Sequence, residues 1–160
     1  MSQLIPLPND VEVRLIFKML FGDEVAVDPN DTVAPDSDSK MVAIFVDDED
    51  KPVTACVCDR NFVAFTGSAL TRIPLGGAED AAESGDFSEM MLGNFHEVMN
   101  ICSSLFMNSG SPHLRLDTVY PTLDATPEGA RAMIDSCQGR IDFDVAIPRY
   151  GNGELSFLRN

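Results

Sequence analysis

The chain has 160 residues, 44% of them hydrophobic, which is enough for one domain with its own core. Its 26 acidic residues outnumber its 11 basic residues and give a formal net charge of −15. That charge argues against nucleic acid and anionic membranes as partners of the surface as a whole. Lys18 interrupts the only apolar candidate near the N-terminus, so no signal peptide or membrane span is expected, and a cytoplasmic protein is the default expectation.

The chain is predicted to open with a helix. Asn9 or Asp10 is placed to cap it, its apolar residues recur at helical spacing up to about Phe21, and Gly22 follows where helices commonly end. A short strand is expected over residues 24–27.

A polar, acidic, proline-containing segment over residues 28–39 is predicted to be a mobile loop. Two runs rich in Val, Ile, Phe, Ala and Cys follow, at 40–46 and 52–59, and an acidic turn joins them. This pattern predicts a hairpin in a sheet that is covered on at least one face.

Helical spacing resumes over residues 60–73, and Pro74 ends it. Gly67 in the middle of this helix lowers its intrinsic stability by up to about 1 kcal/mol relative to alanine, so a close packing contact is expected there. The Gly-, Ala- and acid-rich residues 75–86 lack the lysine of a phosphate-binding loop and read as a connector.

A proline-free helix is predicted over residues 88–107, with Ser88 as its N-cap. Its apolar side chains share one face; they are Met91, Phe95, Val98, Met99, Cys102, Leu105 and Phe106. The opposite face carries Gly93, Glu97, Asn100 and Ser104. A carboxylate and a carboxamide one turn apart, between small residues, allow another surface to approach closely, although such a pair on an exposed face is usually only solvated.

The end of the chain is predicted to add three strands and a helix. Residues 113–120 alternate as a half-buried strand does, and Thr126 and Pro127 are placed as the N-cap and first residue of a helix. Strands at 140–149 and 154–158 flank a glycine-containing turn. The predicted fold class is α+β, with helices packed on a largely antiparallel β-sheet.

No CxxC motif occurs among the four cysteines. Cys56 and Cys58 alternate within an apolar run, and Cys102 lies on the apolar face of the predicted helix. Buried, reduced thiols are therefore expected rather than a metal site.

A strand hairpin followed by a helix that carries Glu97 and Asn100 as ExxN resembles the CheC/CheX/FliY family of chemotaxis phosphatases. The resemblance implies a single CheX-like domain over 1–160, with the N-terminal helix and mobile acidic loop in 1–37 and the core in 38–160. It also implies hydrolysis of the aspartyl phosphate on a CheY-like response-regulator receiver domain. Asn100 would position the attacking water, and Glu97 would hold the receiver through its active-site lysine. The resemblance also implies that the protein needs no cofactor of its own, because Mg²⁺ would belong to the receiver.

Two departures from the family pattern stand out. Ser104 occupies a position that is often glycine in relatives, and the later helix offers Glu128 and Arg131, whose guanidinium cannot replace the second Asn. The chain thus resembles the single-site CheX type, which implies a homodimer. Two alternatives stay open: a non-catalytic CheX-like module that docks a receiver or itself, and an unrelated helix-on-sheet domain in which the first two helices bury Glu97.

Overall fold

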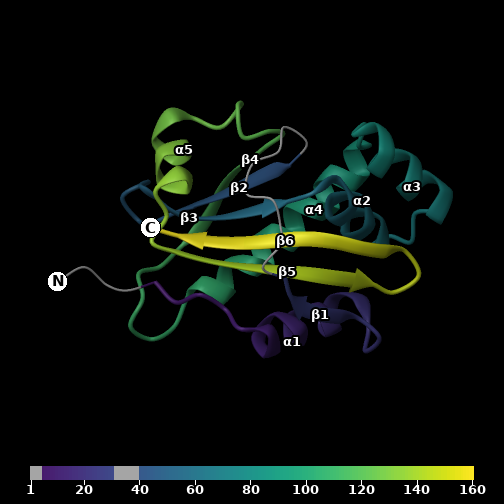
Figure 1. The fold of residues 1–160 in the computed structure, drawn as a ribbon, viewed down its shortest axis with the longest axis horizontal. Coiled ribbons are helices and arrows are strands. Elements are labelled where there is room, and N and C mark those ends of the chain that lie inside the picture. Colours follow the sequence, from purple (N-terminus) through teal and green to yellow (C-terminus); the bar gives the residue numbers. More distant parts are fainter. Residues whose placement is uncertain (1–4, 31–39) are drawn as a thin grey trace.

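The computed structural model describes residues 5–30 and 40–160 of the chain (Figure 1). Most of the acidic segment predicted to be a mobile loop, residues 31–39, lies outside these ranges. The elements follow the order α1 (Asp10–Phe21), β1 (Ala26–Pro29), β2 (Met41–Val46), β3 (Pro52–Cys58), α2 (Arg60–Ala69), α3 (Leu75–Ser84), α4 (Glu89–Cys102), the 3₁₀ helix η1 (Ser103–Phe106), β4 (Arg115–Tyr120), α5 (Glu128–Asp135), β5 (Gly139–Ile147) and β6 (Gly151–Arg159).

The strands form one six-stranded sheet in the order β1-β5-β6-β3-β2-β4. Every neighbouring pair is antiparallel, and both predicted hairpins, β2–β3 and β5–β6, are present. The α+β class with helices on an antiparallel sheet is therefore confirmed. The contact between β3 and β6 joins the two hairpins at the centre of the sheet.

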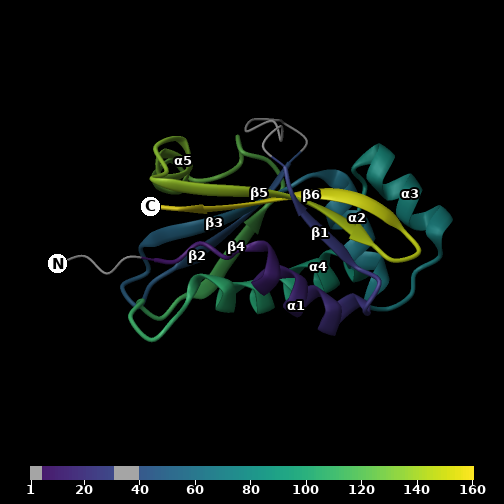
Figure 2. The same cartoon turned by 60° about the horizontal axis from the view of Figure 1, so that its bottom comes forward.

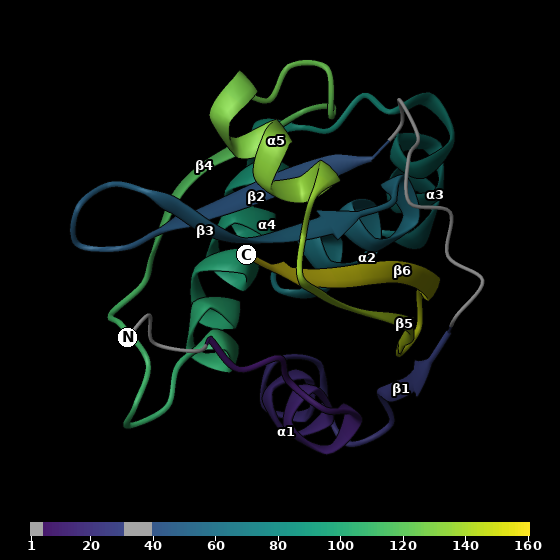
Figure 3. The ribbon, with the colours of Figure 1, turned by 60° about the vertical axis from the view of Figure 1, so that its left-hand side comes forward.

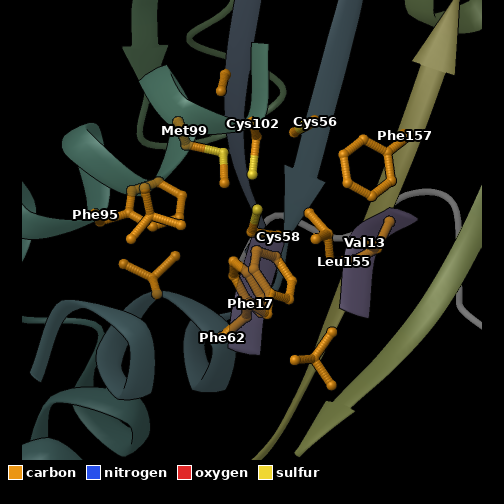
Figure 4. Packing of buried hydrophobic residues seen from close by; sticks show 14 of the residues in the cluster. Val13, Phe17, Cys56, Cys58, Phe62, Phe95, Met99, Cys102, Leu155 and Phe157 are labelled. Atoms are coloured by element: carbon orange, nitrogen blue, oxygen red, sulfur yellow. The ribbon is translucent and has the colours of Figure 1, made fainter. Parts of the chain in front are cut away.

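The main core lies on the face of the sheet that α1, α2 and α4 cover (Figure 2). The alternation predicted for β5 places Phe143, Val145 and Ile147 in this core. Phe17 of α1 contacts Phe62 of α2 with ring centroids 6.0 Å apart, and further buried side chains surround this pair (Figure 4). The N-terminal helix thus contributes to the same core as the sheet.

The helix α5 lies on the opposite face, where it contacts β3 and β6 (Figure 3). Its side chains Ala130, Met133 and Ile134 pack against a second cluster that includes Ile44 and Val57. The sheet is therefore covered on both faces at its β2–β3 end, which explains why both strands read as continuous apolar runs.

Side-chain caps begin three helices: α1 and α4 as predicted, and α2 at Asp59, which the sequence analysis did not single out. The Asn9 side chain accepts a hydrogen bond from the Glu12 amide at 2.9 Å, and the Glu12 carboxylate accepts one from the Asn9 amide at 3.2 Å. Asp59 accepts from the Phe62 amide at 2.8 Å, and Ser88 accepts from the Met91 amide at 3.2 Å. These bonds satisfy amides that have no partner within the helix.

The predicted connector over residues 75–86 is wrong, because Leu75–Ser84 forms α3. Ala78 and Ala81 of this helix are buried, and the helix packs against α2. Gly85 ends it with a left-handed backbone (φ 79°). Burial of one alanine face therefore outweighs the weak helix propensity of Gly76 and Gly77.

Two smaller predictions are also corrected. The helix α5 begins at Glu128 with Pro127 at its N-cap, while the Thr126 hydroxyl donates to the Thr122 carbonyl oxygen instead of capping it. The turn between β5 and β6 lies before Gly151, closed by a hydrogen bond from the Tyr150 amide to the Ile147 carbonyl oxygen. Proline at 148 favours a turn at this earlier point.

Candidate functional site

The helix α4 presents Glu97 and Asn100 to solvent. The predicted Met/Phe stripe of α4 is buried on the other side, with Phe95 1% and Met99 0% exposed. Because this stripe is anchored in the core, the helix cannot rotate about its axis, and the carboxylate and carboxamide point outward. The condition for the unrelated-domain alternative, burial of Glu97 by the first two helices, is not met.

The polar groups of Glu97 and Asn100 are not used within the described part of the chain. No side chain or backbone group in residues 5–30 or 40–160 forms a hydrogen bond or ion pair with either side chain. Residues spaced i, i+3 on a helix have Cβ atoms about 5–6 Å apart. One partner surface can therefore meet an anionic acceptor and an amide that both donates and accepts.

Small residues flank the pair along the helix. A Cβ added at Gly93 would meet no atom within 4 Å, which shows open space above this turn. The Ser104 hydroxyl donates to the Ile101 carbonyl oxygen at 2.9 Å and is thus turned back onto its own helix. The helix tightens to η1 at Ser103, so the predicted helix over 88–107 ends in a 3₁₀ turn.

Asn94, which the sequence analysis did not single out, fixes α4 to α2. Its amide nitrogen donates to the Gly67 carbonyl oxygen at 2.8 Å and to the Thr71 hydroxyl at 2.9 Å. A Cβ at Gly67 would lie 2.6 Å from the Met91 carbonyl oxygen, which confirms the predicted close contact. The helices are therefore held together one turn before Glu97. The signal in the sequence was an amide on the border between the apolar and polar faces.

The site is a helix surface and not an enclosed pocket. Two hollows of about 390 and 750 Å³ lie elsewhere, and neither is lined by Glu97 or Asn100. Within the described ranges no group of three or more His, Cys, Asp or Glu side chains is arranged to hold a metal ion. Nor is any helix there long and apolar enough to cross a membrane.

The four cysteines are free thiols, and three of them are buried. Figure 4 shows Cys56, Cys58 and Cys102 in the core between the sheet and α4. Burial away from water raises the pKa of Cys102 to about 12 and raises the pKa of Cys56 and Cys58 well above the ordinary thiol range. These thiols stay protonated at neutral pH and act as small apolar side chains.

No protein-family model and no curated protein sequence matches the chain. Solved structures do match. The FliM of H. pylori in its complex with FliG has a TM-score of 0.61 at 8% identity, covering 94% of this chain and 85% of that chain. The FliY of Thermotoga maritima has 0.53 at 14% identity, with 92% and 81% covered. The CheX of Borrelia burgdorferi, solved with CheY, has 0.43 at 12% identity, with 95% and 99% covered.

The matches to this FliM and this FliY cover 94% and 92% of the chain. They establish that the chain has a CheC/CheX/FliY-like fold, as the ExxN helix and its flanking strands predicted. At 8–14% identity such a likeness defines the fold alone. The activity has to be argued from the α4 face.

Proposed function

We propose that this protein is a phosphatase of phosphorylated response-regulator receiver domains and docks them through the exposed face of α4. Asn100 positions the hydrolytic water, and Glu97 holds the receiver by pairing with a lysine beside its phosphorylated aspartate. The observation that carries the proposal is the free, outward-pointing Glu97–Asn100 pair on a helix that the core holds rigidly.

The reaction suits these two side chains. Water attacks the phosphorus of the acyl phosphate, the bond from phosphorus to the aspartate oxygen breaks, and inorganic phosphate and a free carboxylate result. Phosphoryl transfer of this kind depends on alignment and charge more than on a covalent role for the enzyme. The Asn100 carboxamide can accept a hydrogen bond from the water through its oxygen and donate one through its nitrogen. The receiver supplies Mg²⁺.

Close docking is compatible with the shape of this face. Gly93 leaves space on one side of the pair, and the Ser104 hydroxyl bonds back to Ile101 on the other. Serine at this position therefore adds little bulk above the helix. Asn94 ties α4 to α2, and so the two groups reach a partner in a fixed orientation.

The decisive experiment follows the loss of phosphate from phosphorylated receivers encoded in the same genome. We expect wild-type protein to accelerate the loss and Asn100→Ala to reduce kcat by about 100-fold or more, as removal of a positioning group does. Glu97→Ala is expected to raise KM more than it lowers kcat, because the carboxylate contributes to binding.

Asn61→Ala is the matched control, since Asn61 is an exposed asparagine of α2. It should leave turnover unchanged. Acceleration that survives in Asn100→Ala would remove Asn100 from the mechanism. If wild-type protein accelerates the loss from none of the receivers, the enzymatic role is abandoned.

A non-catalytic docking module is the second candidate. One observation favours it: the structures that are similar to this chain in fold include FliM solved in complexes with FliG and with SpeE. Binding of a receiver without hydrolysis, weakened by Glu97→Lys and unaffected by Asn100→Ala, would support this candidate over the phosphatase.

A further inference from the structure

The larger of the two hollows lies where three distant parts of the chain meet. It has a volume of about 750 Å³ and is bounded by the end of α1, the junction of α2 and α3, and the turn between β5 and β6 (Figure 1). Apolar side chains form part of its wall, among them Phe21, Ile73 and Tyr150. Two arginines, Arg72 and Arg149, line it as well. A hollow of this size with a few polar groups suits a small organic molecule.

Both arginines have a left-handed backbone, which glycine adopts without strain. Arg72 (φ 55°) follows the end of α2, where the Ile73 amide donates to the Ser68 carbonyl oxygen at 3.0 Å. Arg149 (φ 74°) is the third residue of the turn that the Tyr150 amide closes. Helix ends and turns of these kinds usually carry glycine at such positions. The fold alone therefore favours glycine at both.

Few other residues share this conformation. Among the described residues other than glycine, three have a positive φ, and the third, Asp50, is of a type that tolerates it. Strain of this kind persists mainly where a side chain has a function. A basic residue beyond α2 complements the helix dipole, but this requires no left-handed backbone and does not apply to Arg149. Function in the hollow accounts for both arginines.

The two guanidinium groups are free of partners in the part of the chain that the structure describes. No ion pair or hydrogen bond joins either of them to a side chain or backbone group of residues 5–30 or 40–160. Asp23 and Glu24 line the same hollow, and among the described ion pairs none joins them to these arginines. Both kinds of charged group thus remain available to a ligand.

We propose that this hollow binds a nucleoside phosphate. Each guanidinium is a planar fork, so two of them match the several oxygens of one phosphate, whereas a carboxylate is occupied by a single fork. The carboxylates of Asp23 and Glu24 accept hydrogen bonds from the hydroxyl groups of the sugar. The rings of Phe21 and Tyr150 offer apolar surface to the base.

This site is separate from the Glu97–Asn100 face. The described residues that line the hollow include none of α4. The proposal therefore stands whether or not that face is catalytic, and its test measures binding. The net charge of −15 repels a phosphate at long range, so the affinity depends on contact with the two arginines.

Isothermal titration calorimetry of the wild-type protein with the adenosine, guanosine, cytidine and uridine monophosphates tests the proposal. Inorganic phosphate and the free nucleosides test the two parts of the ligand separately. We expect at least one nucleotide to bind about 10-fold or more tightly than phosphate or its own nucleoside, because both parts contribute contacts. If none of the nucleotides binds, or if phosphate alone binds as tightly, the proposal is overturned.

Arg72→Gly and Arg149→Gly separate binding from backbone strain. Each removes one guanidinium and introduces the residue that the backbone favours. We expect each to weaken nucleotide binding by about 10-fold or more, and to raise the midpoint of thermal unfolding by about 2 °C or more. Arg60→Gln is the matched control, because Arg60 lines the other hollow, and it should leave nucleotide affinity unchanged.

Two results with the glycine variants contradict the proposal. Variants that bind nucleotide as tightly as wild type remove the arginines from the site. Variants that unfold at a lower temperature than wild type show that the arginines serve the fold, which also overturns it. Loss of binding together with greater heat stability is the expected result.

Discussion

Gly153 stands in β6 because α2 passes directly over it. A Cβ at this position would lie 2.5 Å from both the amide nitrogen and the Cα of Phe62. Backbone atoms cannot move aside as the end of a flexible side chain can. Glycine at position 153 therefore allows α2 to approach β6 closely and does not serve to reverse the chain.

Gly153→Ala is therefore expected to lower the free energy of unfolding by about 1–3 kcal/mol, as overpacking does. Urea denaturation at pH 7 measures it. Gly76→Ala is the matched control: Gly76 lies in α3 with no atom within 4 Å of an added Cβ, and alanine should stabilise the helix by up to about 1 kcal/mol. Equal effects of the two substitutions would show that the contact with Phe62 is unimportant.

Some residues of the candidate site can be predicted from the local sequence, and others cannot. Glu97 and Asn100 follow from helical periodicity alone, because the apolar stripe of α4 determines which side chains face solvent. Asn94 does not, since its partners Gly67 and Thr71 lie 27 and 23 residues earlier in the chain. Likewise, Gly153 reads as a turn residue until the position of α2 is known.

The helix α2 is joined to β6 through its N-cap. The Asp59 carboxylate accepts hydrogen bonds from the Phe62 amide at 2.8 Å and the Glu154 amide at 3.1 Å. Burial raises the pKa of Asp59, although these bonds and the charge of Lys40 act in the opposite direction. The N-terminus of α2 is therefore capped by a carboxylate, that of Asp59, which is partly shielded from water.

The sign of this shift makes Asp59→Asn informative. Because the pKa of Asp59 in the folded protein lies above the ordinary value of about 3.9, protonation of this carboxyl favours the folded state. The resulting stability is present below pH 4 and is lost as pH rises through the raised pKa. Asparagine keeps an oxygen acceptor for both amides and carries no charge. Asp59→Asn is therefore expected to be more stable than wild type at pH 7, with an advantage that shrinks as pH falls toward 4.

Urea denaturation of both proteins across this pH range measures the difference. A variant less stable than wild type at pH 7 would mean that the charge on the cap, through its hydrogen bonds and Lys40, outweighs burial. A difference that does not change with pH would place its origin in packing.

Elements with a strong local pattern were predictable, and those that depend on packing were not. Strict alternation identified β5, and caps located the starts of α1 and α4. The helix α3 was missed because its Gly-Gly start has weak propensity and its only apolar face is alanine, which buries little area until α2 is present. In β4 the register with β2 shifts between Leu116 and Thr118, a bulge that alternation alone cannot foresee.

At the scale of the whole molecule, like charges repel across the surface. The excess of 26 acidic over 11 basic residues gives a net charge of −15, and several of the basic side chains are already paired, among them Arg115 with Asp50 and Arg131 with Asp124. Unfolding separates these charges and relieves the repulsion. Low salt should therefore be destabilising, because the screening length is about 30 Å at 0.01 M and about 8 Å at 0.15 M.

We expect the midpoint of thermal unfolding to rise as the NaCl concentration is increased from about 0.01 M to about 0.15 M, the two concentrations for which the screening lengths are given above. Glu49→Lys separates charge from other effects of salt. Glu49 is exposed at the tip of the β2–β3 hairpin, and only its backbone amide is bonded, to Asp47. The substitution should stabilise the protein at low salt by up to about 1 kcal/mol, and less at high salt. Glu49→Gln should give about half that effect, since it removes one charge without adding another. If the three proteins respond to salt identically, repulsion between surface carboxylates does not limit the stability of the fold.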